Sequence, residues 1–423
     1  MGKQLNKIIF VFWLATYPAW GAEPVRLPGA SVEELLELAR QQNPELATMR
    51  LEAEAVAERI YPAGALPDPV LRTELMDITN QGTNKAASLL PSQVGSTRYT
   101  AMQSVPFWGK RDLKREMAEA EAKQAQGRTS VTWAELSARI KKYYAQYYLL
   151  TRSDKLTHEI LDLLANLERI AQSRYATGLA AQQDVIRAQV EQTDLRRDLV
   201  MLETDQHHVM SHINTLLLRP LHEPLAEPRH LRPLPAAGKL TFAALEDRLR
   251  TKNPQLFTLD AQVTAAEKGR ELALKNRYPD FIFGLSPTQA GSQVREWGLM
   301  VELNIPLQQQ TRRSQEREAD TLLAAARSRK EATANQLLGD LIENVLALNS
   351  AQRVETLTTS SLLPQTEATF QAALVGYQTG KVDFATLLDA QRQIFKARLD
   401  VLNAQAEAQT RLAEIEKLLG EEL

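Results

Sequence analysis

Residues 297–306 read Trp-Gly-Leu-Met-Val-Glu-Leu-Asn-Ile-Pro, and this stretch decides the fold. Its large apolar side chains fall on every second residue, between glycine, methionine, glutamate and asparagine. A period of two places the apolar side chains on one face of a β-strand. After Pro306 the pattern changes to that of a long helix, residues 308–376. The sequence therefore predicts a strand with one apolar face directly before a very long helix.

The same arrangement occurs earlier in the chain, displaced by roughly 200 residues, which indicates an internal repeat. Four short motifs recur in the same order in the two halves. They are Asn43-Pro-Glu-Leu46 and Asn253-Pro-Gln-Leu256, Pro67-Asp68 and Pro279-Asp280, Val105-Pro106 and Ile305-Pro306, and Tyr175-Ala-Thr-Gly178 and Tyr377-Gln-Thr-Gly380.

A proline-rich linker, residues 219–240, separates the two repeats, because its proline density is incompatible with a helix interior. In the first repeat, residues 23–218, the expected helices are 31–42, 44–66, 109–176 and 182–218, and the expected strands are 68–76 and 97–106. In the second repeat, residues 241–423, the expected helices are 241–252, 254–277, 308–376 and 382–419, and the expected strands are 280–286 and 295–305.

The long helices carry the apolar spacing of a coiled coil. In the first one, large apolar residues recur every three or four positions, at Trp133, Leu136, Ile140, Tyr143, Tyr147 and Leu150. The helix of residues 109–176 would span roughly 100 Å at the rise of an α-helix. Two shorter helices of the same repeat add up to a similar length, so we expect them to stack end to end beside it. Pro364 predicts a kink in the second long helix.

The first 22 residues have the features of a secretory signal peptide: Lys3 and Lys7, then an apolar core, then small residues before a cleavage site. The formal net charge of the whole chain is −2, and removal of this segment makes it more negative. This balance gives no reason to expect nucleic acid as a partner. The chain has no cysteine, which excludes disulfides and a lipidated amino-terminal cysteine.

Four strands are too few to close a barrel, and the polar backbone groups of open sheet edges cannot face lipid. Three chains would supply twelve strands, an even number within the range of outer-membrane barrels. We therefore expect a mostly α fold with a small β part. The long helical hairpins would form an α-barrel, and four antiparallel strands per chain would contribute to a trimeric 12-stranded outer-membrane β-barrel.

The order of these features resembles the TolC family of outer-membrane factors over essentially the whole chain after residue 22. The segment Val105-Pro-Phe-Trp-Gly-Lys-Arg111 and the absence of a lipidated cysteine are more similar to the heavy-metal, CzcC-like branch than to the drug branch. The resemblance implies a homotrimer in the cell outer membrane with a long periplasmic portion. It also implies a periplasmic adaptor and an inner-membrane pump as partners, with passive transport and no cofactor.

The turns at Tyr175–Gly178 and Tyr377–Gly380 lie between helices, where glycine can adopt the left-handed conformation that ends a helix. One interpretation is two ordinary helical turns. The resemblance implies instead a periplasmic tip that docks the adaptor and opens.

Carboxylates often narrow the closed tip in this family, just after the second glycine. The matching positions here are Thr386 and Asp389, and their counterparts in the first repeat are Asp184 and Arg187. A ring of three Asp389 side chains would attract cations. An exposed polar helix face is the alternative.

Aromatic and basic residues follow the strands in both repeats, where a membrane wall would meet the aqueous phase. An aromatic girdle with basic contacts to lipid headgroups is one interpretation, and a solvated helix start is the other. The candidate membrane-interface residues are Phe107, Trp108, Lys110, Arg111, Trp297, Arg312 and Arg313.

His208 and His212 have the i, i+4 spacing that can hold a metal on one helix face, although such pairs are more often exposed polar residues. We find no catalytic constellation and expect no enzyme. The leading hypothesis is an outer-membrane channel of a tripartite efflux system. The alternative is a periplasmic coiled-coil adaptor or scaffold, which would lack the doubled strand pairs.

Overall fold

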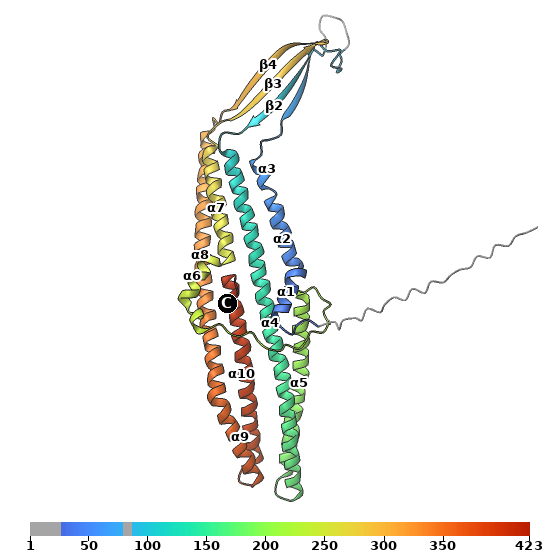
Figure 1. Ribbon diagram of the computed structural model, residues 1–423, viewed down its shortest axis with the longest axis vertical. Helices are drawn as coiled ribbons and strands as arrows, with labels where there is room; N and C mark the ends of the chain where they lie inside the picture. The colour runs from blue at the N-terminus through green and yellow to red at the C-terminus, as the bar shows by residue number, and fades with distance from the viewer. Residues whose placement is uncertain (1–26, 79–86) are drawn as a thin grey trace, which may run out of the picture.

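The computed structural model describes residues 27–78 and 87–423, so the predicted signal peptide, residues 1–22, lies outside the described part. The molecule is elongated, with a β-sheet at one end (Figure 1). At the other end lie the turns that connect paired long helices. Among the described residues, no helix is both long and apolar enough to cross a membrane.

Two helical hairpins form most of the length (Figure 1). The helix α4 has 67 residues, so it extends about 100 Å. In the second repeat, the counterpart of α4 is divided into α8, the short π-helix η2 and α9. The hairpin helices are α4 (Lys110–Ala176), α5 (Gln182–Leu216), α8 (Gln309–Leu357), η2 (Thr358–Leu362), α9 (Leu363–Gln378) and α10 (Phe384–Leu419).

The π-helical turn η2 lies at the place where Pro364 predicts an interruption. Proline has no amide hydrogen to donate to the carbonyl four residues earlier, and its ring crowds that carbonyl. A local π-turn widens the helix at this point, which is a common response to a broken hydrogen-bond ladder. The α-helical hydrogen-bond ladder of the second long helix is therefore interrupted at η2.

Shorter helices stack on the ends of α5 and α10, as the lengths predict. Asn43 caps the helix that follows it, because its Oδ1 accepts from the backbone N–H of Leu46, and its Nδ2 donates to the carbonyl of Leu216 at the end of α5 (2.9 Å). Asn253 makes the same two bonds in the second repeat. Each Asn-Pro motif thus joins two stacked helices. The remaining helices are α1 (Val32–Gln42), α2 (Pro44–Ala57), α3 (Ile60–Gly64), η1 (Ala237–Leu240), α6 (Phe242–Lys252) and α7 (Pro254–Lys275).

The single helix expected over residues 44–66 is wrong, because the chain there forms α2 and the short α3. Pro62 explains the break: it cannot donate to the carbonyl of Glu58, and the backbone turns at Glu58 and Arg59. The strand β3 continues four residues beyond its expected end at residue 286. The linker also contains the 3₁₀-helix η1, which the sequence pattern does not indicate.

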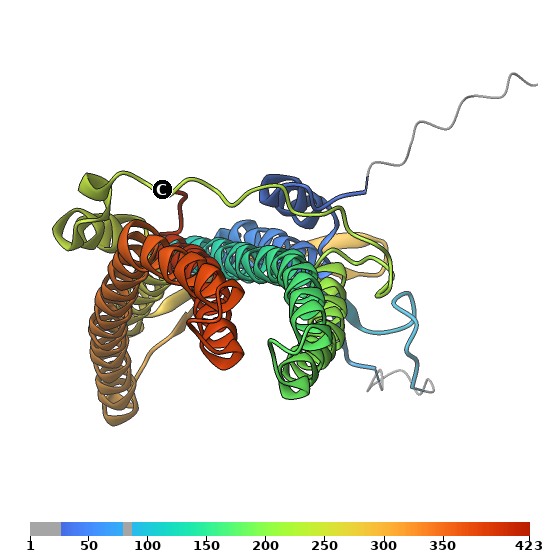
Figure 2. The same cartoon turned by 90° about the horizontal axis from the view of Figure 1, so that it is seen from below.

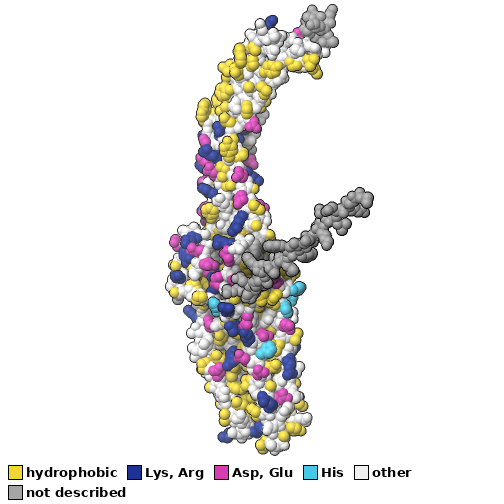
Figure 3. Space-filling view, turned by 45° about the vertical axis from the view of Figure 1, so that its right-hand side comes forward, with side chains coloured by type: hydrophobic (Ala, Val, Ile, Leu, Met, Phe, Trp, Pro, Cys, Tyr) yellow, Lys and Arg dark blue, Asp and Glu magenta, His cyan; other side chains and the backbone are white. Residues whose placement is uncertain are grey.

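The four strands form one antiparallel sheet in the order β1-β2-β3-β4, so the two repeats join through β2 and β3. Residues directly opposite each other share a face. Phe283 lies opposite Val301, and Leu285 lies opposite Leu299, and these four apolar side chains are all exposed. The end of the molecule that contains the sheet, at the top of Figure 3, accordingly has many hydrophobic side chains at its surface. The strands are β1 (Val70–Met76), β2 (Ser96–Val105), β3 (Asp280–Ala290) and β4 (Gln293–Asn304).

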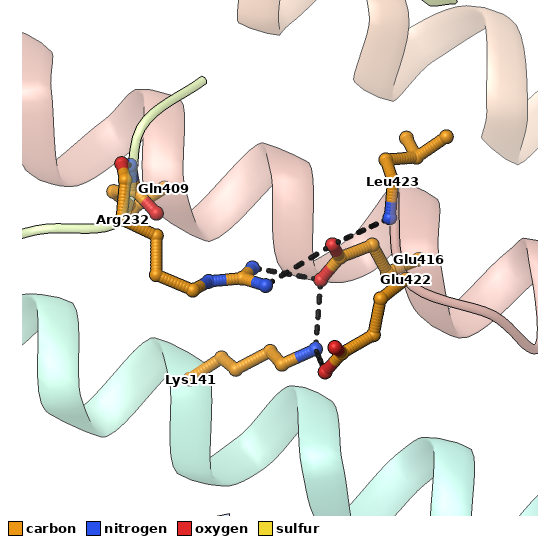
Figure 4. Close-up of polar contacts among 6 residues, drawn as sticks. All are labelled: Lys141, Arg232, Gln409, Glu416, Glu422 and Leu423. Atoms are coloured by element: carbon orange, nitrogen blue, oxygen red, sulfur yellow. Dashed lines mark hydrogen bonds and ion pairs between the residues drawn. The ribbon is translucent and has the colours of Figure 1, made fainter. Parts of the chain in front are cut away.

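The linker, α1 and α6 lie together on one side of the curved layer of long helices (Figure 2). A buried charge cluster fixes the linker to this layer (Figure 4). The Glu416 side chain on α10 is 4% exposed and pairs with Lys141 of α4 (2.9 Å) and Arg232 of the linker (2.8 Å). Glu422 also pairs with Lys141, and the linker carbonyl at Arg232 accepts from Gln409. These contacts join three distant parts of the chain.

Candidate functional site

The sheet has one apolar and one polar face, as the alternation in residues 297–305 predicts. On the polar face, Glu74 lies between Arg72 and Arg98, with a nitrogen to oxygen distance of 3.9 Å to each. Arg98 also donates from Nε to Thr288 on β3 (3.3 Å). The apolar face carries Leu71, Leu75, Tyr99, Ala101, Phe281, Phe283, Leu285, Trp297, Leu299, Val301 and Leu303.

The two edge strands of this sheet, β1 and β4, each pair on one side only within the described chain. Their outer backbone N–H and C=O groups are therefore available to another strand. In water such edges are open to pairing with other chains, and in lipid they would be strongly unfavourable.

At the junction between the sheet and the helices, the surroundings of Lys110 differ from those that the sequence predicts. Its side chain is buried and donates from Nζ to Asp280 (2.8 Å) and to the carbonyl of Tyr278 (2.9 Å). The expected contact of Lys110 with lipid headgroups is therefore wrong. A buried ammonium needs a carboxylate partner, and Asp280 of the second repeat supplies it. Phe107 stacks on Tyr278 with ring centroids 4.5 Å apart, so the same junction is closed by an aromatic pair.

The other candidate interface residues remain at the surface. Trp108 is 75% exposed and Trp297 is 69% exposed. Arg111 donates to the carbonyl of Gly64 (2.9 Å), so part of its function is to hold α3. Arg312 and Arg313 are the fourth and fifth residues of α8, near the helix start where cations oppose the helix dipole.

The two tip turns have the same hydrogen-bond geometry. Gly178 and Gly380 have φ values of 75° and 77°, a left-handed conformation that favours glycine. In the first turn the N–H of Leu179 donates to the carbonyl of Arg174 (2.8 Å), and in the second that of Lys381 donates to Gly376 (2.8 Å). Both turns are thus Schellman-type helix ends.

Arg174 connects the two turns. It donates to the carbonyl of Gln378 (2.5 Å) in the second turn and to that of Leu179 in the first, and it lies over the ring of Tyr377. The hydroxyl of Tyr377 donates to the Asp184 carboxylate (3.3 Å) on α5. Burial, together with the charge of Asp184, raises the pKa of Tyr377 to about 12, so the phenol keeps its proton at neutral pH. These polar contacts therefore join the two hairpins at the tip, next to the apolar core that the hairpins share.

The four candidate constriction residues have different surroundings. Asp184 is engaged with Tyr377, and Thr386 donates from its N–H and hydroxyl to Asp383, the N-cap of α10. Hydrogen bonds from Thr386 hold the pKa of Asp383 below its usual range. Asp389 is exposed and accepts from Gln393 on its own helix (3.1 Å). Arg187 lines a groove of about 580 Å³ between α5 and α10.

The histidine pair has no supporting ligands among residues 27–78 and 87–423, where no group of three or more His, Cys, Asp or Glu side chains could hold a metal ion. His212 stacks on Tyr143 with ring centroids 5.0 Å apart. His208 is exposed on the same helix.

The sequence pattern described as "Outer membrane efflux protein" matches residues 35–217 and 245–421, one match in each repeat. The chain belongs to this family. It is 23% identical over 415 residues to the cobalt-zinc-cadmium resistance protein CzcC of Cupriavidus metallidurans, covering 96% of this chain and 92% of that protein.

Two further proteins are similar. The pyoverdine export outer membrane protein OpmQ of Pseudomonas aeruginosa is 22% identical over 335 residues, 77% of this chain and 68% of OpmQ. Crystal structures of CusC, which show conformational changes that accompany folding and transmembrane channel formation, superpose with a TM-score of 0.78 at 15% identity. They cover 96% of this chain and 95% of CusC. The fold similarity therefore extends over nearly the whole chain.

This membership confirms the predicted TolC-like fold with two repeats, and the function of an outer-membrane efflux channel with a long periplasmic helical portion. The family is one of trimeric, non-enzymatic channels, so the alternative of a soluble periplasmic scaffold is wrong. The sequence pattern marks Asn43 and Asn253 as helix boundaries but gives no signal for their hydrogen bonds to the ends of α5 and α10. It also gives no signal for Arg174 and Glu416, which hold the tip and the linker in place.

Proposed function

We propose that three copies of this chain assemble into a passive duct that exports heavy-metal cations across the outer membrane. The observation that carries the proposal is the four-stranded sheet with one apolar face and two unpaired edges, joined to helices about 100 Å long. Three such sheets joined edge to edge leave no unpaired backbone in lipid. The helices beneath them would enclose the periplasmic part of the duct.

The tip turns are the proposed docking surface for a periplasmic adaptor, which would link the duct to an inner-membrane pump. Tyr175 and Leu179 support this, because both are exposed at the first turn, at 47% and 67%. Exposed aromatic and aliphatic side chains at the end of a helical hairpin are suited to an apolar partner surface. In the second turn Tyr377 is buried instead, so the two turns would contribute unequally.

Metal cations are the proposed cargo because the similarity to CzcC extends over nearly the full length of both proteins. The similarity to the pyoverdine exporter OpmQ covers a smaller share of each protein. The exposed Asp389 near the tip is consistent with a cation path, since three copies would sum their negative fields. Export of a small organic chelator is the competing cargo class.

Loss of the chain is expected to lower the host's tolerance to cobalt, zinc or cadmium while leaving tolerance to drugs and siderophore export unchanged. Growth of the deletion strain across a panel of metals and organic compounds measures this. Plasmid-borne wild-type chain is the control and restores growth. Sensitivity confined to organic compounds contradicts the metal proposal but leaves the channel intact.

Opening of the tip requires α9 and α10 to separate from α4 and α5, which breaks the bond between Tyr377 and Asp184. Tyr377→Phe removes that bond, worth about 0.5–1.5 kcal/mol, and so shifts the closed-to-open equilibrium by roughly 2- to 10-fold toward open. We expect a higher open probability in planar bilayers.

Tyr175→Phe is the matched control for this experiment. It is the repeat counterpart of Tyr377, and its hydroxyl makes no hydrogen bond within the described residues. Equal open probabilities in the two variants would show that the bond does not hold the tip closed.

A further inference from the structure

We propose a residue-by-residue register for the contact between copies: β4 of one copy pairs with β1 of the next copy in the same register as β2 and β3 pair within the chain. The inference rests on the proposed trimer and specifies which side chains meet at its seam. It places Leu303 opposite Leu71, Val301 opposite Thr73, and Glu302 opposite Arg72 of the neighbouring copy.

The first step is that the two hairpins are structural copies. The motif Pro67-Asp68 recurs 212 residues later as Pro279-Asp280, which relates β1 to β3, and Val105-Pro106 recurs 200 residues later, which relates β2 to β4. Moved by these displacements, the pair of Val70 and Met102 becomes Ile282 and Glu302. That pair is present in the structure. The displacements found in the sequence therefore hold for the backbone pairing.

The second step applies the same displacements to the seam between the repeats. Within the chain, Met102 lies opposite Gly284, and Gln103 lies opposite Phe283. Their repeat counterparts are Glu302 with Arg72 and Leu303 with Leu71. In this register all seven residues of β1 lie opposite residues 298–304 of β4, so the shorter edge strand is paired along its full length.

The third step is agreement of the faces. Leu71, Thr73, Leu299, Val301 and Leu303 all lie on the apolar face of the sheet in one chain. The proposed register keeps them on one face across the seam. A slip by one residue would move every β1 side chain to the opposite face and place Leu71 among polar groups.

The fourth step is charge, which is independent of the repeat. Arg72 is on the polar face of β1 with its side chain 57% exposed, and the nearest acid in its own chain is Glu74 at 3.9 Å. Glu302 is exposed on the polar face of β4 and forms no ion pair with any described residue. The register places these opposite charges directly across from each other, a favourable cross-strand pair. A slip by two residues, which preserves the faces, would place Arg72 opposite Met300 or Asn304 instead.

Engineered cysteines test the register, because the chain has no cysteine of its own. Thr73→Cys with Val301→Cys is expected to form disulfide-linked dimers and trimers in outer membranes under mild oxidation. The matched controls are Thr73→Cys with Leu299→Cys and Thr73→Cys with Leu303→Cys. In each control pair the two cysteines lie on the apolar face but diagonally across the seam. Diagonal neighbours are about 7–8 Å apart, a distance at which a disulfide forms poorly.

Cross-linking that is at least several-fold faster in the first pair than in both controls supports the register. Faster cross-linking in a control pair overturns the register but leaves the trimer, as does a trimer that cross-links in none of them. A detergent-extracted chain that is monomeric before oxidation overturns the proposed duct as well.

Charge exchange provides a second readout that does not depend on cysteine geometry. Glu302→Arg should lower the temperature at which the detergent-extracted trimer dissociates, and Arg72→Glu in the same chain should restore it. Absence of this restoration overturns the contact between Arg72 and Glu302.

Discussion

Glu416→Gln is expected to lower the free energy of unfolding by about 3–5 kcal/mol, because it leaves buried cations without their shared carboxylate. The side chains of Glu416 and Lys141 are both 4% exposed, and that of Arg232 is 17% exposed. The variant keeps the size of the side chain, so the loss reports charge and hydrogen bonding rather than packing. Denaturation of the detergent-extracted protein, followed by circular dichroism, measures the change.

Glu422→Gln is the matched control, since Glu422 also binds Lys141 but its side chain is 68% exposed. The Glu422 carboxylate is largely solvated, and Lys141 keeps Glu416 as its buried partner, so we expect a loss closer to that of a surface ion pair, about 0–1 kcal/mol. If the two variants lose equal stability, the cluster is not a buried anchor for the linker.

The stability lost in Glu416→Gln should depend on pH, because the pKa of Glu416 is shifted in the folded wild-type protein. Burial alone would raise the pKa of Glu416, but the hydrogen bond from Arg232 and the charges of Lys141 and Arg232 outweigh it and hold the pKa below its usual range. The folded carboxyl therefore binds its proton less readily than the unfolded one. Its stabilising contribution is complete above the unfolded pKa and is lost as the pH falls through the folded pKa. The difference between wild type and Glu416→Gln should accordingly shrink in acid.

Most of the fold could be predicted from local patterns. The period of two in residues 297–305 placed β4, and the recurrence of Asn-Pro and Tyr-x-x-Gly located the helix starts and the tip turns in both repeats. Pro364 indicates the interruption at η2, whereas Pro62 interrupts a stretch that the sequence pattern predicts as one helix. Each of these features is determined by residues close together in the chain, so local sequence patterns are sufficient to predict it.

The contacts that hold the candidate site together could not be predicted in this way. The position of Lys110 after an aromatic pair predicts a headgroup contact, but its partner Asp280 lies 170 residues further along the chain. Arg174 and Gln378 are separated by 204 residues, and Lys141 and Glu416 by 275. Ion pairs of this separation have no local signature, so only the packing of the helices brings them together.

The internal repeat marks one residue of such a contact in the sequence. The displacement of 212 residues relates Asp280 to Asp68, and both follow a proline. Asp280 is the first residue of β3, and Asp68 lies two residues before β1. An acid retained at both positions indicates a function at the junction of strand and helix. Asp280 performs that function inside the chain through Lys110, and Asp68 occupies the corresponding place at the outer edge.

Leu299→Arg is expected to destabilise the membrane-inserted protein by about 2–4 kcal/mol per copy, the cost of a cation near the middle of a lipid-facing strand. Leu299 is 80% exposed on the apolar face, and its cross-strand neighbour is Leu285, which cannot compensate an introduced charge. Met300→Arg is the matched control. It introduces the same side chain at the next residue, which lies on the polar face.

The measurement is the amount of each variant recovered from the outer membrane as a heat-resistant trimer, together with its unfolding free energy in lipid vesicles. Leu299→Arg should be depleted in both, while Met300→Arg should remain close to wild type, because strand alternation directs its charge toward an aqueous interior. Equal depletion of the two variants would show that the apolar face does not contact lipid. A more severe loss for Met300→Arg would reverse the assignment of the faces, and with it the inside and outside of the proposed duct.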